Sequence, residues 1–159
     1  MDLLKIKYDL RKCSSKERAK ILQSFFKTGP GQYAQGDIFL GVKVPMLRIL
    51  AKRYQGLAFN ATLQLLKSPI HEERLLSLLV FILKYRKAGL VGKERIYKVY
   101  LKHSRYINNW DLVDATAKHI VGDFLKDRDK SVLYKLASSD SLWERRIAIL
   151  STFHFIENN

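Results

Sequence analysis

Apolar residues recur at helical spacing along most of the chain. A periodic apolar run passes through Ala19, Ile21, Leu22, Phe25 and Phe26, as on the buried face of an amphipathic helix. Ser14 and Glu17 precede this run as a capping box would. The same spacing predicts further helices near residues 45–54, 59–67, 71–87, 92–104, 109–125, 130–138 and 142–156. The pattern therefore predicts an all-α protein, with core aromatic rings at Phe25, Phe26, Phe81 and Phe153.

Short interruptions separate the predicted helices. Gly56, Gly89 and Asn108-Asn109 mark tight connections, so we expect antiparallel helix pairs. The 8 glycines and 3 prolines of the whole chain are too few for a turn-rich β-sandwich. The glycine-bearing stretch 28–44 is longer, but it lacks the closing Gly-Lys-Ser/Thr of a phosphate-binding loop. It is either a structural connection or a loop whose backbone approaches a ligand near Lys43.

An internal repeat supports stacked helix pairs. The stretch His-Glu-Glu-Arg-Leu at 71–75 matches Trp-Glu-Arg-Arg-Ile at 143–147, an offset of two periods of about 36 residues, as in helix-pair repeats. Arg74, Trp110 and Arg146 are then evenly spaced and should form a column on one face. The sequence predicts one domain of stacked helix pairs over residues 1–159, with a period close to those of tetratricopeptide and of HEAT-like or ARM-like repeats. A chance match within a helix-rich chain is the alternative.

The charge balance points to a polyanionic partner. The chain has 29 Lys plus Arg against 15 Asp plus Glu, a formal net charge of +14, and cationic side chains bind phosphates by displacing condensed counterions. A generically basic, solvated surface is the alternative. Basic residues are spread along the chain rather than gathered on one amphipathic helix, which argues against membrane-surface binding.

Several classes of site are absent from the sequence. The single cysteine, Cys13, excludes an internal disulfide and a Cys-x-x-Cys zinc site. No apolar run reaches about 18 residues, the length that a membrane-spanning helix needs, and the N-terminus does not resemble a signal peptide. We therefore expect a cytoplasmic protein. Four histidines show no metal-ligand spacing: His71, His103, His119 and His154.

The stretch from Asn108 to Asp114 could carry chemistry. Trp110 and Asp114 lie four residues apart and so share one helix face. In the repeat, Asp114 falls where Leu78 and Leu150 stand in the neighbouring units. A carboxylate at such a position is costly unless it has a partner or a function, so an ion pair that joins two repeats and a reactive group are both open.

Arg146 falls one period after Trp110 and would complete a cluster of a cation, an aromatic ring and a carboxylate. Arginine can hold a phosphate through two hydrogen bonds, and tryptophan can pack against a sugar or a base. A carboxylate facing DNA is useful where positive charge develops on a sugar. The cluster therefore hints at cleavage of an N-glycosidic bond.

Four segments resemble signature stretches of the AlkD-type DNA alkylation-repair family, and the resemblance runs from about residue 15 to the end of the chain. They are residues 28–33, 36–42, 109–114 and 142–146. The resemblance implies a curved solenoid of HEAT-like repeats. It also implies a monofunctional glycosylase that excises N3- and N7-alkylated purines from duplex DNA, with no metal or organic cofactor and without a deep base pocket.

The resemblance also implies roles for individual residues. Asp114 would stabilise the developing sugar cation and position water, Trp110 would pack against the damaged nucleotide, and Arg146 would hold a flanking phosphate. The neighbouring Arg145 could instead make that contact, and the repeat register favours Arg146. Lys43 and Arg74 are further expected DNA contacts. A protein with these roles would be associated with the nucleoid.

The chain departs from the family at its end. Members usually continue with further repeats, whereas residues 147–156 form an almost wholly apolar stretch that closes this sequence. We expect that C-terminal repeats are absent and that the exposed last helix promotes self-association. A non-catalytic DNA-binding module and a scaffold for an acidic protein remain alternatives to the enzyme. The preferred adduct and the oligomeric state stay open.

Overall fold

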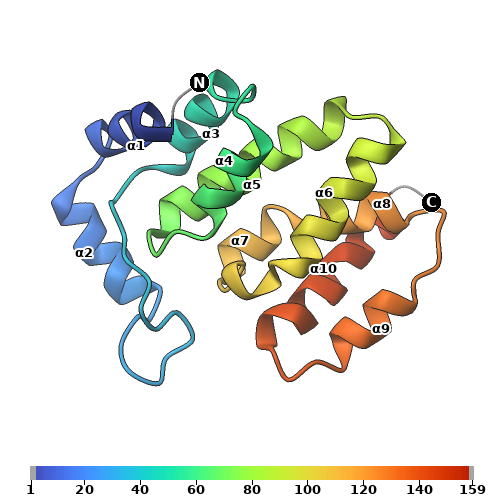
Figure 1. Ribbon diagram of the computed structural model, residues 1–159. Helices are drawn as coiled ribbons and strands as arrows, with labels where there is room; N and C mark the ends of the chain where they lie inside the picture. The colour runs from blue at the N-terminus through green and yellow to red at the C-terminus, as the bar shows by residue number, and fades with distance from the viewer. Residues whose placement is uncertain (1–2, 158–159) are drawn as a thin grey trace. The chain divides into compact units, whose positions relative to one another are not determined.

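The computed structural model describes residues 3–157, and every regular element in this range is helical (Figure 1). An isolated bridge between Ile38 and Ile70 is the only β-type pairing among these residues. The all-α prediction is therefore confirmed. The first elements are α1 (Leu3–Lys12), α2 (Lys16–Phe25), α3 (Val44–Arg53), α4 (Phe59–Leu66), α5 (His71–Lys87) and α6 (Leu90–Lys102). The later elements are η1 (Ser104–Tyr106), α7 (Trp110–Asp114), η2 (Lys118–Gly122), α8 (Asp123–Leu125), α9 (Ser131–Ala137) and α10 (Leu142–Glu157).

Most predicted helices are present within a few residues of their expected ends, and two differences stand out. The helix α1 was not predicted, although Ile6 and Leu10 lie four residues apart and are both fully buried. The predicted helix 109–125 is divided into α7, the π-helical η2 and α8. No helix within residues 3–157 combines the length and the apolar character that crossing a membrane requires.

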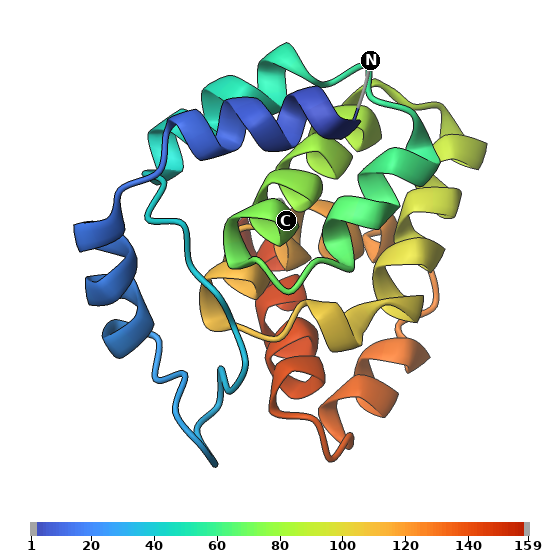
Figure 2. The same cartoon turned by 60° about the vertical axis from the view of Figure 1, so that its left-hand side comes forward.

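The chain forms two compact units, residues 1–83 and 84–159, and α5 runs across their boundary. In the first unit α1 lies alongside α3 (Figure 2). The hydroxyl of Tyr54, which follows α3, donates a 2.5 Å hydrogen bond to Asp9 of α1. The buried side chains Leu47 and Leu50 supply the core face of α3.

The long connection between α2 and α3 is fastened to the start of α5. The carboxylate of Glu72 accepts hydrogen bonds from the backbone N–H groups of Leu40, Gly41 and Val42 at 2.7–3.2 Å. Gly41 has φ +78°, and a Cβ there would lie 2.2 Å from the carbonyl oxygen of Ser15. Only glycine fits this backbone without a shift. The structural interpretation of the loop is thus supported.

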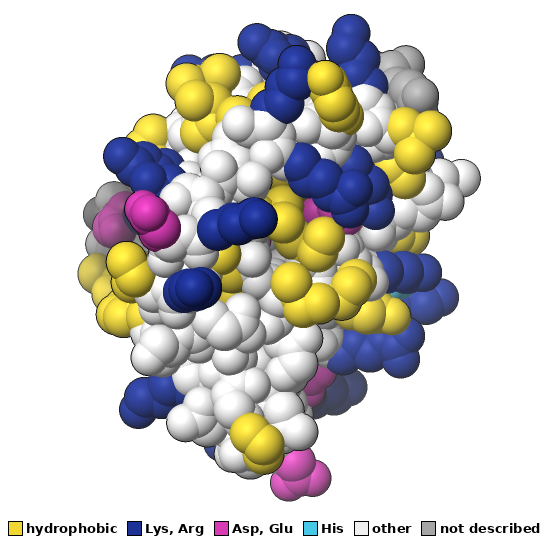
Figure 3. All heavy atoms as spheres, turned by 90° about the vertical axis from the view of Figure 1, so that its left-hand side faces the viewer, with side chains coloured by type: hydrophobic (Ala, Val, Ile, Leu, Met, Phe, Trp, Pro, Cys, Tyr) yellow, Lys and Arg dark blue, Asp and Glu magenta, His cyan; other side chains and the backbone are white. Residues whose placement is uncertain are grey.

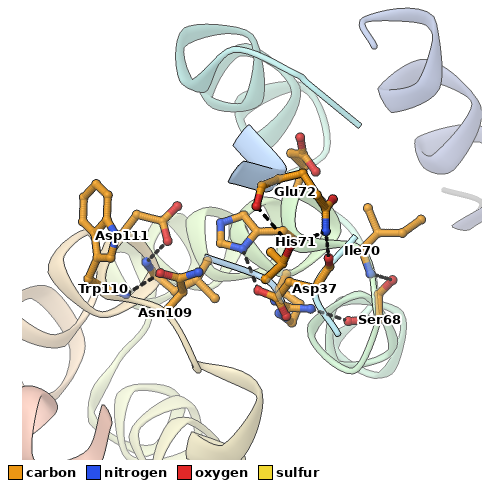
Figure 4. A network of polar contacts seen from close by, with 12 residues as sticks. Asp37, Ser68, Ile70, His71, Glu72, Asn109, Trp110 and Asp111 are labelled. Atoms are coloured by element: carbon orange, nitrogen blue, oxygen red, sulfur yellow. Dashed lines mark hydrogen bonds and ion pairs between the residues drawn. The ribbon is translucent and has the colours of Figure 1, made fainter. Parts of the chain in front are cut away.

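Aromatic and charged side chains pack together under this loop. The rings of Phe39 and His71 are stacked with centroids 4.5 Å apart, and Phe26 stacks on Phe39 at 5.0 Å. In Figure 4 the imidazole of His71 points toward Asp37, whose carboxylate lies 3.2 Å from Nδ1. Asp37 also forms a 2.6 Å ion pair with Arg74. Charged groups buried at this depth are stable only when they are paired in this way.

In the second unit α10 is the central helix, in contact with α7, η2 and α9. Its buried positions include Ile147, Ala148 and Ser151. A Cβ on Gly122 would lie 2.5 Å from the carbonyl oxygen of Ser151, so this glycine allows η2 to approach α10 closely. Figures 1 and 2 both show α9 beside α10.

Two of the four aromatic rings that the sequence predicts in the core are not buried in the structure. Phe26 and Phe81 are buried, but Phe25 is 60 % and Phe153 is 45 % exposed. Adjacent or nearly adjacent apolar residues on a helix point in different directions. The apolar pattern therefore marked two side chains that the packing leaves about half exposed.

Candidate nucleic-acid site on α7 and α10

The short helix α7 begins and ends with the two residues that the sequence singled out. Asn109 is fully buried, and its side-chain oxygen accepts a 2.9 Å hydrogen bond from the backbone N–H of Trp110 (Figure 4). Leu112 and Val113 are buried beneath the helix. Trp110 is half-buried and Asp114 is exposed. The cap and the apolar anchor together fix the direction in which this single turn presents its polar residues.

The carboxylate of Asp114 is held by the guanidinium of Arg146 from α10. Arg146 Nε lies 2.6 Å from Asp114 Oδ1, and Arg146 Nη2 lies 2.7 Å from Asp114 Oδ2. This is the parallel, two-pronged geometry of the strongest arginine–carboxylate pairs. The hydrogen bond to Asp114 raises the pKa of the Arg146 guanidinium above its ordinary value. Both side chains keep more than a third of their surface exposed, so the pair is accessible to a ligand.

Neighbouring side chains fix the first turn of α10. Glu144 accepts hydrogen bonds from the hydroxyls of Ser139 at 2.5 Å and Ser104 at 2.7 Å. These two bonds lower the pKa of the Glu144 carboxyl. Arg145 Nη1 donates to the carbonyl oxygens of Ser139 and Asp140 at 2.6 and 2.9 Å. Glu144 and Arg145 are thus directed at η1 and at the connection before α10, whereas Arg146 is directed at α7.

A buried pair supports α7 from below. The hydroxyls of Tyr100 and Thr116 lie 2.8 Å apart, and Thr116 Oγ1 donates to the carbonyl oxygen of Leu112 at 2.5 Å. Burial raises the pKa of Tyr100 well above its ordinary range, so the hydroxyl stays neutral. The sequence carries no signal for this contact because the partners lie on different elements, 16 residues apart.

The structure corrects the repeat register by one residue. Arg74 Nη1 donates to the carbonyl oxygen of Ser68, and Arg145 Nη1 donates to that of Ser139, each bond reaching six residues back along the chain. Arg145 thus makes the contact that Arg74 makes in the earlier stretch, and the prediction that Arg74 lies on an exposed face is wrong because Arg74 is buried. The residue-by-residue match of the two stretches was misleading because Arg145 and Arg146 are adjacent in the second stretch. Arg146 corresponds instead to Leu75, which is buried.

The residues expected to bind DNA have different environments. Arg74 is 3 % exposed and has the carboxylate of Asp37 and the carbonyl oxygen of Ser68 as partners, so it is a structural cation inside the first unit and not a surface contact. Arg145 is half-buried and ties down the connection before α10. Lys43 is exposed immediately before α3. Its role in binding DNA stays a prediction.

Within residues 3–157 no three His, Cys, Asp or Glu side chains are arranged so that they could hold a metal ion. The site consists instead of one ion pair and one aromatic ring, on two helices of an all-α unit with strongly basic composition. This defines an all-α protein with an accessible charged pair.

Comparison with known families identifies the group to which it belongs. Residues 6–159 match the family model described as DNA alkylation repair enzyme, and the chain is a member of this family. No curated protein and no solved structure matches the chain. Membership bears out the suspected AlkD-type relationship.

Proposed function

We propose that this protein is a monofunctional DNA glycosylase that excises N3- and N7-alkylated purines from duplex DNA. The observation that carries the proposal is the accessible Asp114–Arg146 pair one helical turn from Trp110. Membership in a family of DNA alkylation repair enzymes makes damaged DNA the natural substrate to test.

The chemistry requires stabilisation of a sugar cation. An N3- or N7-alkylated purine is positively charged, so the glycosidic bond breaks with its electron pair moving to the base, which leaves neutral. Positive charge then develops at the sugar carbon, where an ionised carboxylate lowers the energy of the transition state. Water adds to that carbon and loses a proton, and the products are the free base and an abasic site. Asp114 would supply the carboxylate and orient the water.

Arg146 would join this carboxylate to the DNA backbone. A guanidinium has five N–H donors, and only Nε and Nη2 face Asp114. The donors on Nη1 are available for a phosphate next to the damaged nucleotide. One side chain would then fix both the carboxylate and the strand that carries the lesion. Trp110 would pack against the sugar of that nucleotide.

General affinity for DNA would come from the basic surface. On the face seen in Figure 3, Lys and Arg side chains are spread among apolar ones, and acidic side chains are sparse. With a formal net charge of +14, binding to undamaged duplex DNA should weaken steeply with added salt.

The second candidate is a DNA-binding module without catalytic activity. It is favoured by the same ion pair, because a carboxylate engaged by both of its oxygens is also what a purely structural link between α7 and α10 would need. Such a module would bind DNA in a salt-dependent way and release no base.

Self-association is part of the proposal. Tyr134 of α9 and Ile149 and Ile156 of α10 are each at least 60 % exposed. A cavity of about 310 Å³ lies between these helices, lined mainly by apolar side chains such as Leu133, Ile149 and Phe155. Exposed apolar surface of this kind favours association. Sedimentation velocity across a range of protein concentrations should show a dimer that Ile149→Glu dissociates.

The deciding experiment measures release of 7-methylguanine from methylated duplex DNA. We expect release by the wild-type chain and by Asp127→Asn, which removes an exposed carboxylate outside the site. Asp114→Asn should lose release while it keeps its affinity for DNA. Full activity of Asp114→Asn would overturn the proposed role. Binding of DNA by the wild-type chain without any release would favour the non-catalytic module.

A further inference from the structure

A second cavity, with a polar lining, lies in the unit formed by residues 84–159, outside the site described above. It has a volume of about 180 Å³, roughly the volume that six water molecules occupy in liquid water. We call it the basic pocket, and it is lined by Tyr85, Arg86, Lys93, His119, Asp123 and His154. These residues come from α5, α6, η2, α8 and α10, so five elements converge on one small space.

Three side chains that line the basic pocket are hydrogen-bonded to one another. Asp123 Oδ2 accepts from the hydroxyl of Tyr85 at 2.7 Å and from Lys93 Nζ at 3.0 Å. The Lys93 ammonium also lies over the Tyr85 ring, 4.7 Å from its centroid. Burial raises the pKa of Asp123, but the hydrogen bonds from Tyr85 and Lys93, together with the nearby positive charges, hold it below its ordinary value. The carboxylate is therefore ionised, and the single negative charge of the pocket is already balanced by Lys93.

Two other lining groups, Arg86 and His119, have no acceptor among residues 3–157. Arg86 is exposed, and no carboxylate in residues 3–157 lies within ion-pair distance of its guanidinium. The ring nitrogens of His119 likewise have no hydrogen-bond partner in the described part of the chain. His154 Nε2 faces Asp123 Oδ1 at 3.8 Å. A guanidinium and two imidazoles thus surround a space next to one carboxylate oxygen.

We propose that the basic pocket binds a single phosphate group, and that the imidazole of His119 takes up a proton when the phosphate enters. The guanidinium fork of Arg86 matches two phosphate oxygens. A third oxygen would accept from His119, and a protonated P–OH could donate to Asp123 Oδ1. A divalent cation does not suit this lining because Arg86 and Lys93 would repel it.

The charges around His119 explain the coupling to protons. Burial lowers the pKa of His119, with further lowering by Arg86, Lys118 and His154, and Glu157 opposes this shift. Lys118 is itself paired with Glu157. The imidazole is therefore more often neutral in the empty pocket than in water. An anion reverses the local potential and favours the charged imidazolium, so affinity should rise as pH falls from about 8 to about 5.5 through the ordinary range of histidine.

The test follows the histidine ring signals by NMR while inorganic phosphate is added. Saturating phosphate should raise the pKa of His119 by about one unit, which corresponds to about tenfold tighter binding at the acidic end of the titration. Sulfate keeps a constant charge over this pH range and serves as the reference anion. Sulfate should raise the pKa of His119 as phosphate does. Because sulfate itself does not titrate in this range, the proton taken up can then be assigned to the protein.

Two variants keep the proposal falsifiable. Arg86→Gln should weaken phosphate binding at least about tenfold, because it removes the charged, two-pronged donor of the pocket. Lys102→Gln removes one cation from an exposed position on α6, outside the pocket, and should bind phosphate as the wild type does. An unchanged pKa of His119 on addition of phosphate, or equal weakening by both variants, would overturn the proposal. Thermal melting checks that both variants are folded.

Undamaged duplex DNA without terminal phosphates distinguishes the source of the phosphate. If it raises the pKa of His119 and inorganic phosphate competes with it, the pocket holds a backbone phosphodiester. If phosphate and adenosine monophosphate bind but the duplex leaves His119 unchanged, the ligand is a small phosphorylated molecule. Neither arm contains an alkylated base, so the result is independent of the proposed glycosylase activity.

Discussion

Arg146 holds Asp114 through two parallel hydrogen bonds, of 2.6 and 2.7 Å, that join α10 to α7. The partners are 32 residues apart in the chain. Because both side chains remain partly exposed, the pair is a surface ion pair with a fixed geometry. Its orientation depends on Glu144 and Arg145, which hold the start of α10 in place.

Replacing Arg146 by lysine should separate charge from geometry. Arg146→Lys keeps a positive charge but cannot make two parallel hydrogen bonds to Asp114. We expect the single-turnover rate of 7-methylguanine release to fall at least about tenfold, a loss of about 1.4 kcal/mol in transition-state stabilisation. The affinity for undamaged DNA should change little.

The neighbouring arginine provides the control. Arg145→Lys loses hydrogen bonds to two carbonyl oxygens, so it should lower the free energy of unfolding by about 1–2 kcal/mol and leave the rate of the folded protein near that of the wild type. A rate loss in Arg145→Lys, with none in Arg146→Lys, would exchange the proposed roles of the two arginines.

Lys43 and Arg74 should respond differently to neutralisation. Lys43 is exposed and Arg74 is buried in an ion pair with Asp37. Lys43→Gln should reduce the slope of log affinity against log salt by about one, as the loss of one phosphate contact predicts, without a change in stability. Arg74→Gln should leave Asp37 with one buried partner fewer and cost about 3–5 kcal/mol of unfolding free energy. Fluorescence anisotropy and urea denaturation measure the two effects. An altered salt slope for a folded Arg74→Gln would show that this residue reaches DNA.

Two glycines of the connection before α3 form a matched pair. Gly36 and Gly41 both have positive φ, but only a Cβ at Gly41 would collide with backbone atoms, those of Ser15 and Ala19. Gly36→Ala should cost about 1–2 kcal/mol for the left-handed conformation alone. Gly41→Ala adds a clash and should cost about 1–3 kcal/mol more. Equal urea midpoints for the two variants would contradict the close approach of this loop to α2.

Glu72 should be more important for stability than its place in a run of charged residues suggests. Its carboxylate accepts from three consecutive backbone N–H groups, and a glutamine amide would place a donor against these donors. We expect Glu72→Gln to lower the free energy of unfolding by about 2–3 kcal/mol. The exposed Glu17 of α2 is the reference, and Glu17→Gln should fall within about 0.5 kcal/mol of the wild type. If the two variants unfold at the same urea concentration, the loop does not depend on Glu72.

Acid should weaken the second unit partly through Glu144. The hydroxyls of Ser139 and Ser104 lower the pKa of Glu144 in the folded state. Its stabilising effect is therefore present above the unfolded value of about 4.5 and is lost as pH falls through the lower folded value. Glu144→Gln should be less stable than the wild type near pH 7 by about 1 kcal/mol. It should also show a flatter decline in melting temperature below about pH 5. Parallel declines for both proteins would mean that Glu144 does not titrate in this range.

Much of this protein is determined locally by its sequence. Apolar spacing predicted α2 to α6, α9 and α10 because a helix buries one face, and each turn repeats that requirement. The residue types of Asn109, Trp110 and Asp114 predicted the cap, the ring and the carboxylate of α7, since all three lie within six consecutive residues. The excess of basic residues likewise follows from composition alone.

The tertiary structure decided which side chains meet. Arg74 and Arg145 occupy equivalent positions in two similar stretches, and one is buried with Asp37 while the other ties down a loop. Arg146 pairs with Asp114 because the hydrogen bonds of Glu144 and Arg145 orient α10. The basic pocket draws on five elements. Such contacts depend on packing between residues distant in the chain, and no local spacing records them.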